Sequence, residues 1–116
     1  MKTKIFNNIL IYYPEGRIRN DSAEEFEHRL ERLIDHHGSC DLILNMEGVP
    51  SISSNGIAVL ISIAQKMKAE DRIFSICSPK DLAMKIISIL NIRGFIAVYE
   101  SEEEAIDERL REAAAV

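Results

Sequence analysis

The sequence contains no tryptophan and few of the residues that mark special classes of protein, with five glycines, three prolines and two cysteines among 116 residues. No internal repeat, linker or low-complexity run appears. Cys40 and Cys77 stand at no motif spacing and favour buried thiols in a reducing compartment. The histidines, His28, His36 and His37, do not combine with them in the pattern of a zinc site. We therefore predict no metal and no cofactor.

Long apolar runs are also missing. No stretch approaches the roughly 18 consecutive apolar residues of a membrane span, and the first residues lack the apolar core of a signal peptide. We therefore expect a cytoplasmic protein without a membrane span. A surplus of basic residues is missing too, because the net charge is −5. That charge argues against nucleic-acid binding and leaves protein partners open. The length predicts one domain, residues 1–116.

The sequence lacks the motifs of common enzymes. It has no G-x-S-x-G nucleophile elbow around its serines, no GxGxxG after the first strand and no GxxxxGK[ST] loop for a nucleotide. Glu47 and Asp41 flank an apolar run, but single carboxylates at strand ends are usually solvated loop residues. Catalysis needs a convergent set of groups, such as a nucleophile with its base or paired carboxylates. We therefore expect a protein that is not an enzyme.

The first third of the chain shows short β-favouring runs followed by helical periodicity. Residues 9–13 form an apolar run, and residues 14–16 interrupt it before a second predicted strand at 17–19. An amphipathic helix is expected to begin within residues 20–22, where N-cap residues gather, and to end near Gly38.

The rest of the chain alternates strands with helices. The continuous apolar run at 42–46 is typical of a strand covered on both faces, and the helix from Ser54 should be the most buried one. The remaining expected elements are a strand at 72–77, a helix with Pro79 in its first turn and an inner stripe of Leu82, Ile86, Ile89 and Leu90, a strand at 95–99, and a helix opened by a capping box of Ser101 and Glu104. The order ββαβαβαβα predicts a single α/β domain with a small, mostly parallel mixed sheet covered by helices.

The strongest functional signal lies in LILNMEGVPSISSNGIAVLI, residues 42–61. Here a strand passes through a short loop into a helix that opens on Ser53 and Ser54. The first amides of a helix lack internal partners and lie at the positive end of the helix dipole, so hydroxyls and anions are stabilised there. By residue type alone, the serines favour an ordinary helix start that one of them caps.

This segment resembles the central motif of the STAS domain of bacterial anti-sigma factor antagonists, whose usual form is LDLSGVxxIDSSGLGVLL. The resemblance continues through RIFSICSP, DLAMKIISILNIRGF and AVYESEEEAI in family order, over nearly the full length. It implies a STAS domain over residues 1–116. It also implies that the phosphoacceptor, which in the family stands two residues before the glycine, is Ser54.

The resemblance implies a role in transcription regulation by partner switching. The unphosphorylated domain binds an anti-sigma factor that is also a serine kinase, and the sigma factor is released. Phosphorylation by that kinase ends the binding, and a serine phosphatase restores it. The partner-binding residues implied by the motif are Ser53, Ser54, Asn55, Gly56, Ala58 and Asn20.

The chain departs from the usual family pattern at several positions. Ser53 stands where an aspartate is common, and Asn55 replaces a second serine or threonine. Ala58 replaces the second glycine of Gly-Leu-Gly. Before the first helix, Arg19 occupies a position where an acid is common, which changes the charge of a neighbouring loop.

Two alternatives stay open at this point. One is a STAS scaffold or transporter-associated subunit that has no phosphorylation cycle. The other is an enzyme or small-ligand binder with its site at the carboxyl ends of the strands, where open parallel sheets often hold ligands. The oligomeric state is left open between a monomer and a weak dimer.

Overall fold

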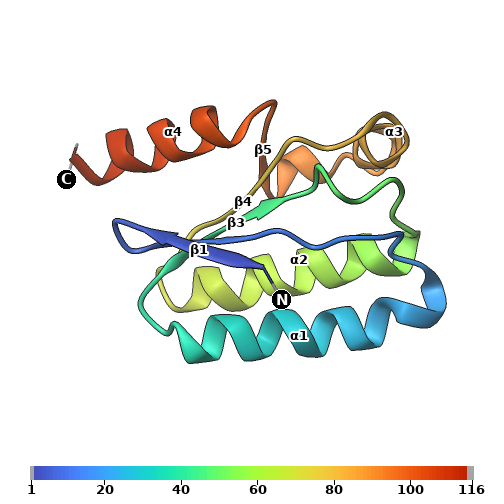
Figure 1. Cartoon of the computed structure of the whole chain (residues 1–116), viewed down its shortest axis with the longest axis horizontal. Helices are drawn as coiled ribbons and strands as arrows, with labels where there is room; N and C mark the ends of the chain where they lie inside the picture. Colours follow the sequence, from blue (N-terminus) through green and yellow to red (C-terminus); the bar gives the residue numbers. More distant parts are fainter. Residues whose placement is uncertain (1, 115–116) are drawn as a thin grey trace.

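The computed structural model describes residues 2–114, which form one five-stranded sheet with helices on both faces (Figure 1). The strands are β1 (Thr3–Phe6), β2 (Ile9–Tyr12), β3 (Asp41–Asn45), β4 (Phe74–Cys77) and β5 (Ala97–Tyr99). They lie in the order β1-β2-β3-β4-β5. β1 runs antiparallel to β2, and every other neighbouring pair is parallel. The predicted mixed, mostly parallel sheet is confirmed.

The helices are α1 (Ala23–His36), α2 (Ser54–Ala69), α3 (Asp81–Ile89) and α4 (Glu102–Ala114), with short 3-10 turns η1 (Asn20–Ser22) and η2 (Ile92–Gly94). α1 and α2 lie side by side on one face of the sheet, and α4 lies on the opposite face (Figure 1). The element order ββαβαβαβα is as predicted. Within residues 2–114, no helix combines the length and apolar character that crossing a membrane requires.

β2 and β3 are buried on both faces, which explains why their sequences do not alternate between apolar and polar residues. Leu10 and Leu42 are paired neighbours that face the larger core beneath α1 and α2. Ile11 and Ile43, the next pair along, face the smaller core beneath α4. Side chains alternate between the faces of a strand, so a strand covered on both sides is apolar throughout.

The opening pair of strands lies earlier in the chain than the sequence predicted. β1 precedes β2, and the two are joined by Asn7 and Asn8, both with positive φ (47° and 65°). Residues 17–19 form no strand, and only Ile18 pairs, in a single bridge with Ile52. β1 is exposed along its whole length, so its sequence lacks the alternation of apolar and polar residues that marks a half-buried strand. The informative signal was the asparagine pair, because asparagine tolerates the left-handed conformation that a tight hairpin turn requires.

The predicted inner stripe of α3 is wrong at three of its four positions, because only Ile86 is half-buried against the core. Ala83 and Ile87 are the buried residues of this helix, whereas Leu82, Ile89 and Leu90 are exposed. Pro79 lies before the helix rather than in its first turn, since Lys80 is the N-cap. The helix is short and contacts the core through small Ala83, so a narrow contact face replaces the broad apolar stripe expected from hydrophobicity.

Candidate functional site at the start of α2

The loop between β3 and α2 is held by the segment that leads into α1. Gly16 N donates to Gly48 O at 2.9 Å, and Ile18 N donates to Ser51 O at 3.0 Å. In the opposite direction, Ser53 N donates to Ile18 O at 2.8 Å. These bonds connect two segments that are more than thirty residues apart in the sequence. They fix the backbone that leads directly into the serine pair.

Ser53 is the N-cap of α2. Its backbone is extended (φ −79°, ψ 168°), and its Oγ accepts a hydrogen bond from Gly56 N at 3.1 Å. Its carbonyl accepts the first bond of the helix ladder, from Ile57 N at 3.0 Å. One free amide of the helix start is therefore satisfied by the Ser53 side chain. The capping function expected of the serine pair belongs to Ser53.

Ser54 is the first residue of α2 and is exposed to solvent. Its hydroxyl makes no hydrogen bond with the part of the chain that the structure describes, in contrast to that of Ser53. The first turn of α2 contains no acidic residue. A hydroxyl at this position is thus free, accessible and at the positive end of a 16-residue helix. Chemically, it can accept a phosphoryl group or donate a hydrogen bond to a partner.

The other predicted partner-binding residues around Ser54 are partly exposed and partly buried. Asn55 and Ala58 are exposed on the first turns of α2, and Asn20 is exposed on η1, which packs against α2. Gly56 is instead buried, and a Cβ atom there would lie 2.6 Å from Ile52 Cγ1. Gly56 therefore supports the site from within, and the accessible surface comes from its neighbours.

Charge beside the site comes from the loop before α1. Arg19 Nε lies 3.3 Å from Asp21 Oδ1, and both side chains are more than 70% exposed. The Arg19 backbone is fixed locally, because its N–H donates to Ser22 Oγ at 2.9 Å. An exposed pair of this kind contributes little to stability. Arg19 is therefore available to other anionic groups.

A residue that the sequence analysis missed orients the other end of the β3–α2 loop. Asn45, the last residue of β3, donates from Nδ2 to Glu102 Oε1 at 3.1 Å. Its Oδ1 accepts from Glu47 N at 2.9 Å, which fixes the chain where it leaves the strand. Burial and the nearby Glu102 raise the pKa of Tyr13 in the same region. The only signal in the sequence was a single polar residue within the apolar run LILNM.

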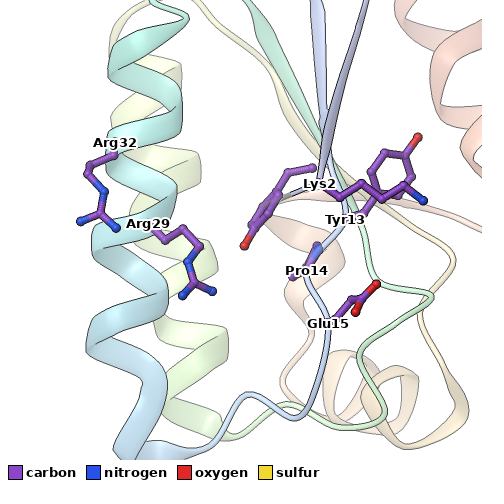
Figure 2. A pocket seen from close by; sticks show the side chains of 7 residues that line it. Lys2, Tyr13, Pro14, Glu15, Arg29 and Arg32 are labelled. Carbon is purple, nitrogen blue, oxygen red and sulfur yellow. The ribbon is translucent and has the colours of Figure 1, made fainter.

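A groove of about 650 Å³ lies at the carboxyl end of β2, between the strands and α1. Figure 2 shows Arg29 and Arg32 projecting from α1, while Lys2 extends on the strand side toward Tyr13. The Lys2 Nζ atom is 4.8 Å from the centre of the Tyr13 ring. The basic groups therefore point in different directions rather than toward one centre. Residues 2–114 also contain no cluster of three or more histidine, cysteine or acidic side chains that could hold a metal.

Comparison with known proteins connects this fold and helix start to a family. A family model described as STAS domain matches residues 1–105. A Thermotoga neapolitana protein assigned as a homologue of the anti-sigma factor antagonist TM1081 is 23% identical over 105 residues, which cover 90% of this chain and 93% of the relative. The chain belongs to the STAS domain family, as its central motif predicted.

Two solved structures share the fold. A crystal structure from Thermotoga maritima, assigned as that of an anti-sigma factor antagonist, superposes with a TM-score of 0.82 at 21% identity and covers 92% of each chain. The structure of the anti-sigma factor antagonist SpoIIAA in its unphosphorylated form superposes with a TM-score of 0.75 at 17% identity and covers 96% of each chain. At these identities the likeness concerns the fold, which is that of a STAS domain.

Proposed function

We propose that this STAS domain is an anti-sigma factor antagonist that works by partner switching. In its unphosphorylated form it binds an anti-sigma factor that is also a serine kinase, so that the sigma factor is released. Phosphorylation of Ser54 ends the binding, and a serine phosphatase restores it. The observation that carries the proposal is the free, exposed hydroxyl of Ser54 at the first position of α2. The names of two of the similar proteins support the general role of an anti-sigma factor antagonist.

The local geometry favours Ser54 over Ser53 as the phosphoacceptor. The oxygen of Ser53 already accepts the capping bond from Gly56 N, and its residue is half-buried. Modifying it would remove that bond or crowd the helix start. Ser54 is exposed and one residue into the helix, so a phosphate there extends into solvent while the cap stays in place.

The folded domain can tolerate a phosphate at Ser54, whereas a tight protein interface cannot. A phosphate brings about −1.5 to −2 charges, and the start of a helix stabilises negative charge. In a complex formed around a neutral hydroxyl, the same charge would lose its water and meet groups arranged for a small side chain. The switch therefore acts on the complex and leaves the fold unchanged.

The chemistry of the switch belongs to the partners. The kinase transfers the γ-phosphoryl group of ATP to Ser54 Oγ, so a P–O bond to ADP breaks, a P–O bond to serine forms and a base of the kinase takes the hydroxyl proton. The phosphatase transfers the same group to water. On this proposal the domain supplies only the hydroxyl and its position, and is not itself an enzyme.

The proposed partner surface combines four exposed residues with the serine cap beneath them. Ser54, Asn55 and Ala58 present the first turns of α2, and Asn20 adds the adjacent η1. The side chains are small and uncharged, which suits close approach of another protein backbone. The net charge of −5 also suits a protein partner better than a nucleic acid.

The proposal is tested by capturing the partner from native cells with the purified domain and incubating the complex with ATP. We expect a kinase in the captured material, a gain of one phosphate by intact mass, and loss of the complex as the phosphate is added. Ser54→Ala should block the modification and keep the complex. Ser62→Ala, at another exposed serine of α2, is the matched control and should behave as the native chain does.

Two outcomes would overturn the phosphorylation switch. Phosphate located on Ser53 would mean that the acceptor is misassigned. A stable captured complex that gains no phosphate with its own kinase and ATP would favour the alternative of a scaffold or transporter-associated subunit without a phosphorylation cycle. In that case Ser54→Asp should leave complex formation intact, whereas the switch requires that it weaken binding.

A further inference from the structure

The bridge between Ile18 and Ile52 brings Arg19 next to the serine pair. This bridge is parallel, so the residues that follow its two partners, Arg19 and Ser53, leave the paired position side by side. The bonds of Ile18 N to Ser51 O and of Ser53 N to Ile18 O hold the two segments at that register. Arg19 is therefore anchored beside the residue that immediately precedes Ser54.

The direction of the Arg19 side chain follows from its extended backbone (φ −104°, ψ 168°). Ile18 is buried, and its Cγ2 atom lies 2.9 Å from the position that a Cβ of Gly56 would take. Successive side chains of an extended chain point to opposite sides. The Arg19 side chain consequently points away from the core, toward the solvent to which Ser54 is also exposed.

Asp21, the present partner of Arg19, would compete only weakly with a phosphate for the Arg19 guanidinium. Asp21 offers one carboxylate oxygen at 3.3 Å from Nε, and its side chain is 77% exposed. The other charged residues of the segment before Arg19 are Arg17, two residues earlier, and Glu15, four residues earlier, and the first turn of α2 adds no acid. A phosphate presents more negative charge than a carboxylate and three acceptor oxygens for the planar guanidinium.

We propose that a phosphate on Ser54 draws Arg19 away from Asp21 into an ion pair with the phosphate, so that the modified domain neutralises part of the new charge internally. This inference rests on the proposed phosphorylation of Ser54. The partner is excluded less by net charge and more by the bulk of the phosphate and by the loss of the serine hydroxyl as a donor. The phosphatase must also displace Arg19 before it can reach the phosphorus atom.

The test uses the full chain with phosphoserine installed at position 54 by genetic encoding or chemical ligation, so that no kinase is needed. The second pKa of the phosphate, close to 6 when unperturbed, is measured by phosphorus NMR over a pH titration. We expect it to be lower in the native chain than in Arg19→Gln by roughly 0.5 or more, because a nearby cation favours the doubly charged form. High salt should shrink this difference.

Arg17→Gln is the matched control, because it removes one positive charge from the same segment two residues away. It should titrate as the native chain does. The proposal is overturned if Arg19→Gln leaves the phosphate pKa unchanged, or if Arg17→Gln raises it as much as Arg19→Gln. Since the phosphate is installed without the kinase, this result is independent of whether a cellular kinase acts on Ser54.

Discussion

Arg72 Nη2 donates to the carbonyl oxygen of Ile34 at 3.0 Å, across 38 residues of sequence. The same nitrogen donates to His37 O at 2.8 Å, and Nε donates to Cys40 O at 2.8 Å. The guanidinium is also paired with Glu70 at 2.9 Å. The last carbonyls of a helix have no partners within it. Arg72 therefore caps the end of α1 from the residues that lead into β4.

Arg72→Met should destabilise the domain strongly, because it leaves three carbonyl oxygens near the end of α1 without their charged donor. We expect a loss of about 3 kcal/mol in the free energy of unfolding, measured by urea denaturation. Arg32→Met, at an exposed position on α1, is the control and should change stability by no more than about 0.5 kcal/mol. Equal effects of the two substitutions would mean that the buried hydrogen bonds of Arg72 contribute nothing of their own.

Leu60→Ala should cost about 2 to 5 kcal/mol, since Leu60 is fully buried between α2 and the sheet. Ile89→Ala provides the contrast on α3, because its side chain is 74% exposed. That substitution should be close to neutral, within about 0.5 kcal/mol. Thermal unfolding of both variants checks the placement of both helices. A large loss of stability in Ile89→Ala would instead support the buried stripe that the sequence predicted for α3.

Gly56→Ala should destabilise the start of α2 although alanine favours helix. The added Cβ would lie 2.6 Å from Ile52 Cγ1 and 2.9 Å from Ile18 Cγ2, so both isoleucines would have to move. Overpacking of this kind typically costs about 1 to 3 kcal/mol. Gly38→Ala is the control, because the nearest atom to its new Cβ is 3.7 Å away. A Gly56→Ala chain as stable as the native one would show that the contact between these segments can open without cost.

Cys77 should make the domain less stable as the pH rises above about 9. Burial raises the pKa of its thiol from 9.0 to about 11, so the unfolded chain loses its proton at lower pH than the folded one. The folded state then binds more protons, and the free energy of unfolding falls with pH across this window, by an amount on the order of 2 kcal/mol. Denaturant titrations at pH 8 and pH 10.5 should show a smaller loss in Cys77→Ser than in the native chain. An identical loss would assign the effect to other groups, such as Tyr99, whose pKa is also raised by burial.

The fold could be predicted to the level of element order because most elements have one strongly apolar face or are apolar throughout. β3 and α2 are clear in the sequence for this reason. β1 was missed because all its residues are exposed, although it pairs with β2 along its whole length. The buried face of α3 was misplaced because hydrophobicity does not say which of several apolar residues meets the core. Ala83, the smallest of them, allows the close approach.

The candidate site, too, could be predicted from the sequence only in part. The helix start at Ser53 and Ser54 could be predicted because capping depends on residues a few positions apart. The role of Asn45 in the site could not be predicted, nor that of Arg72 at the end of α1, because their long-range partners lie 57 and up to 38 residues away. Side-chain bonds over such separations depend on the final packing and leave no local pattern. The contact of Gly56 with Ile18 is of the same kind.

On the proposed function, the backbone bonds that join Ile18 to Ser51 and Ser53 affect the kinetics of partner recognition. A loop that must order itself on binding lowers the association rate and loses entropy in the complex. Here the segment before Ser54 is already ordered by its neighbour, so a partner meets a rigid surface and docking requires little adjustment of the backbone. Affinity at this surface should then be tuned mainly through the lifetime of the complex.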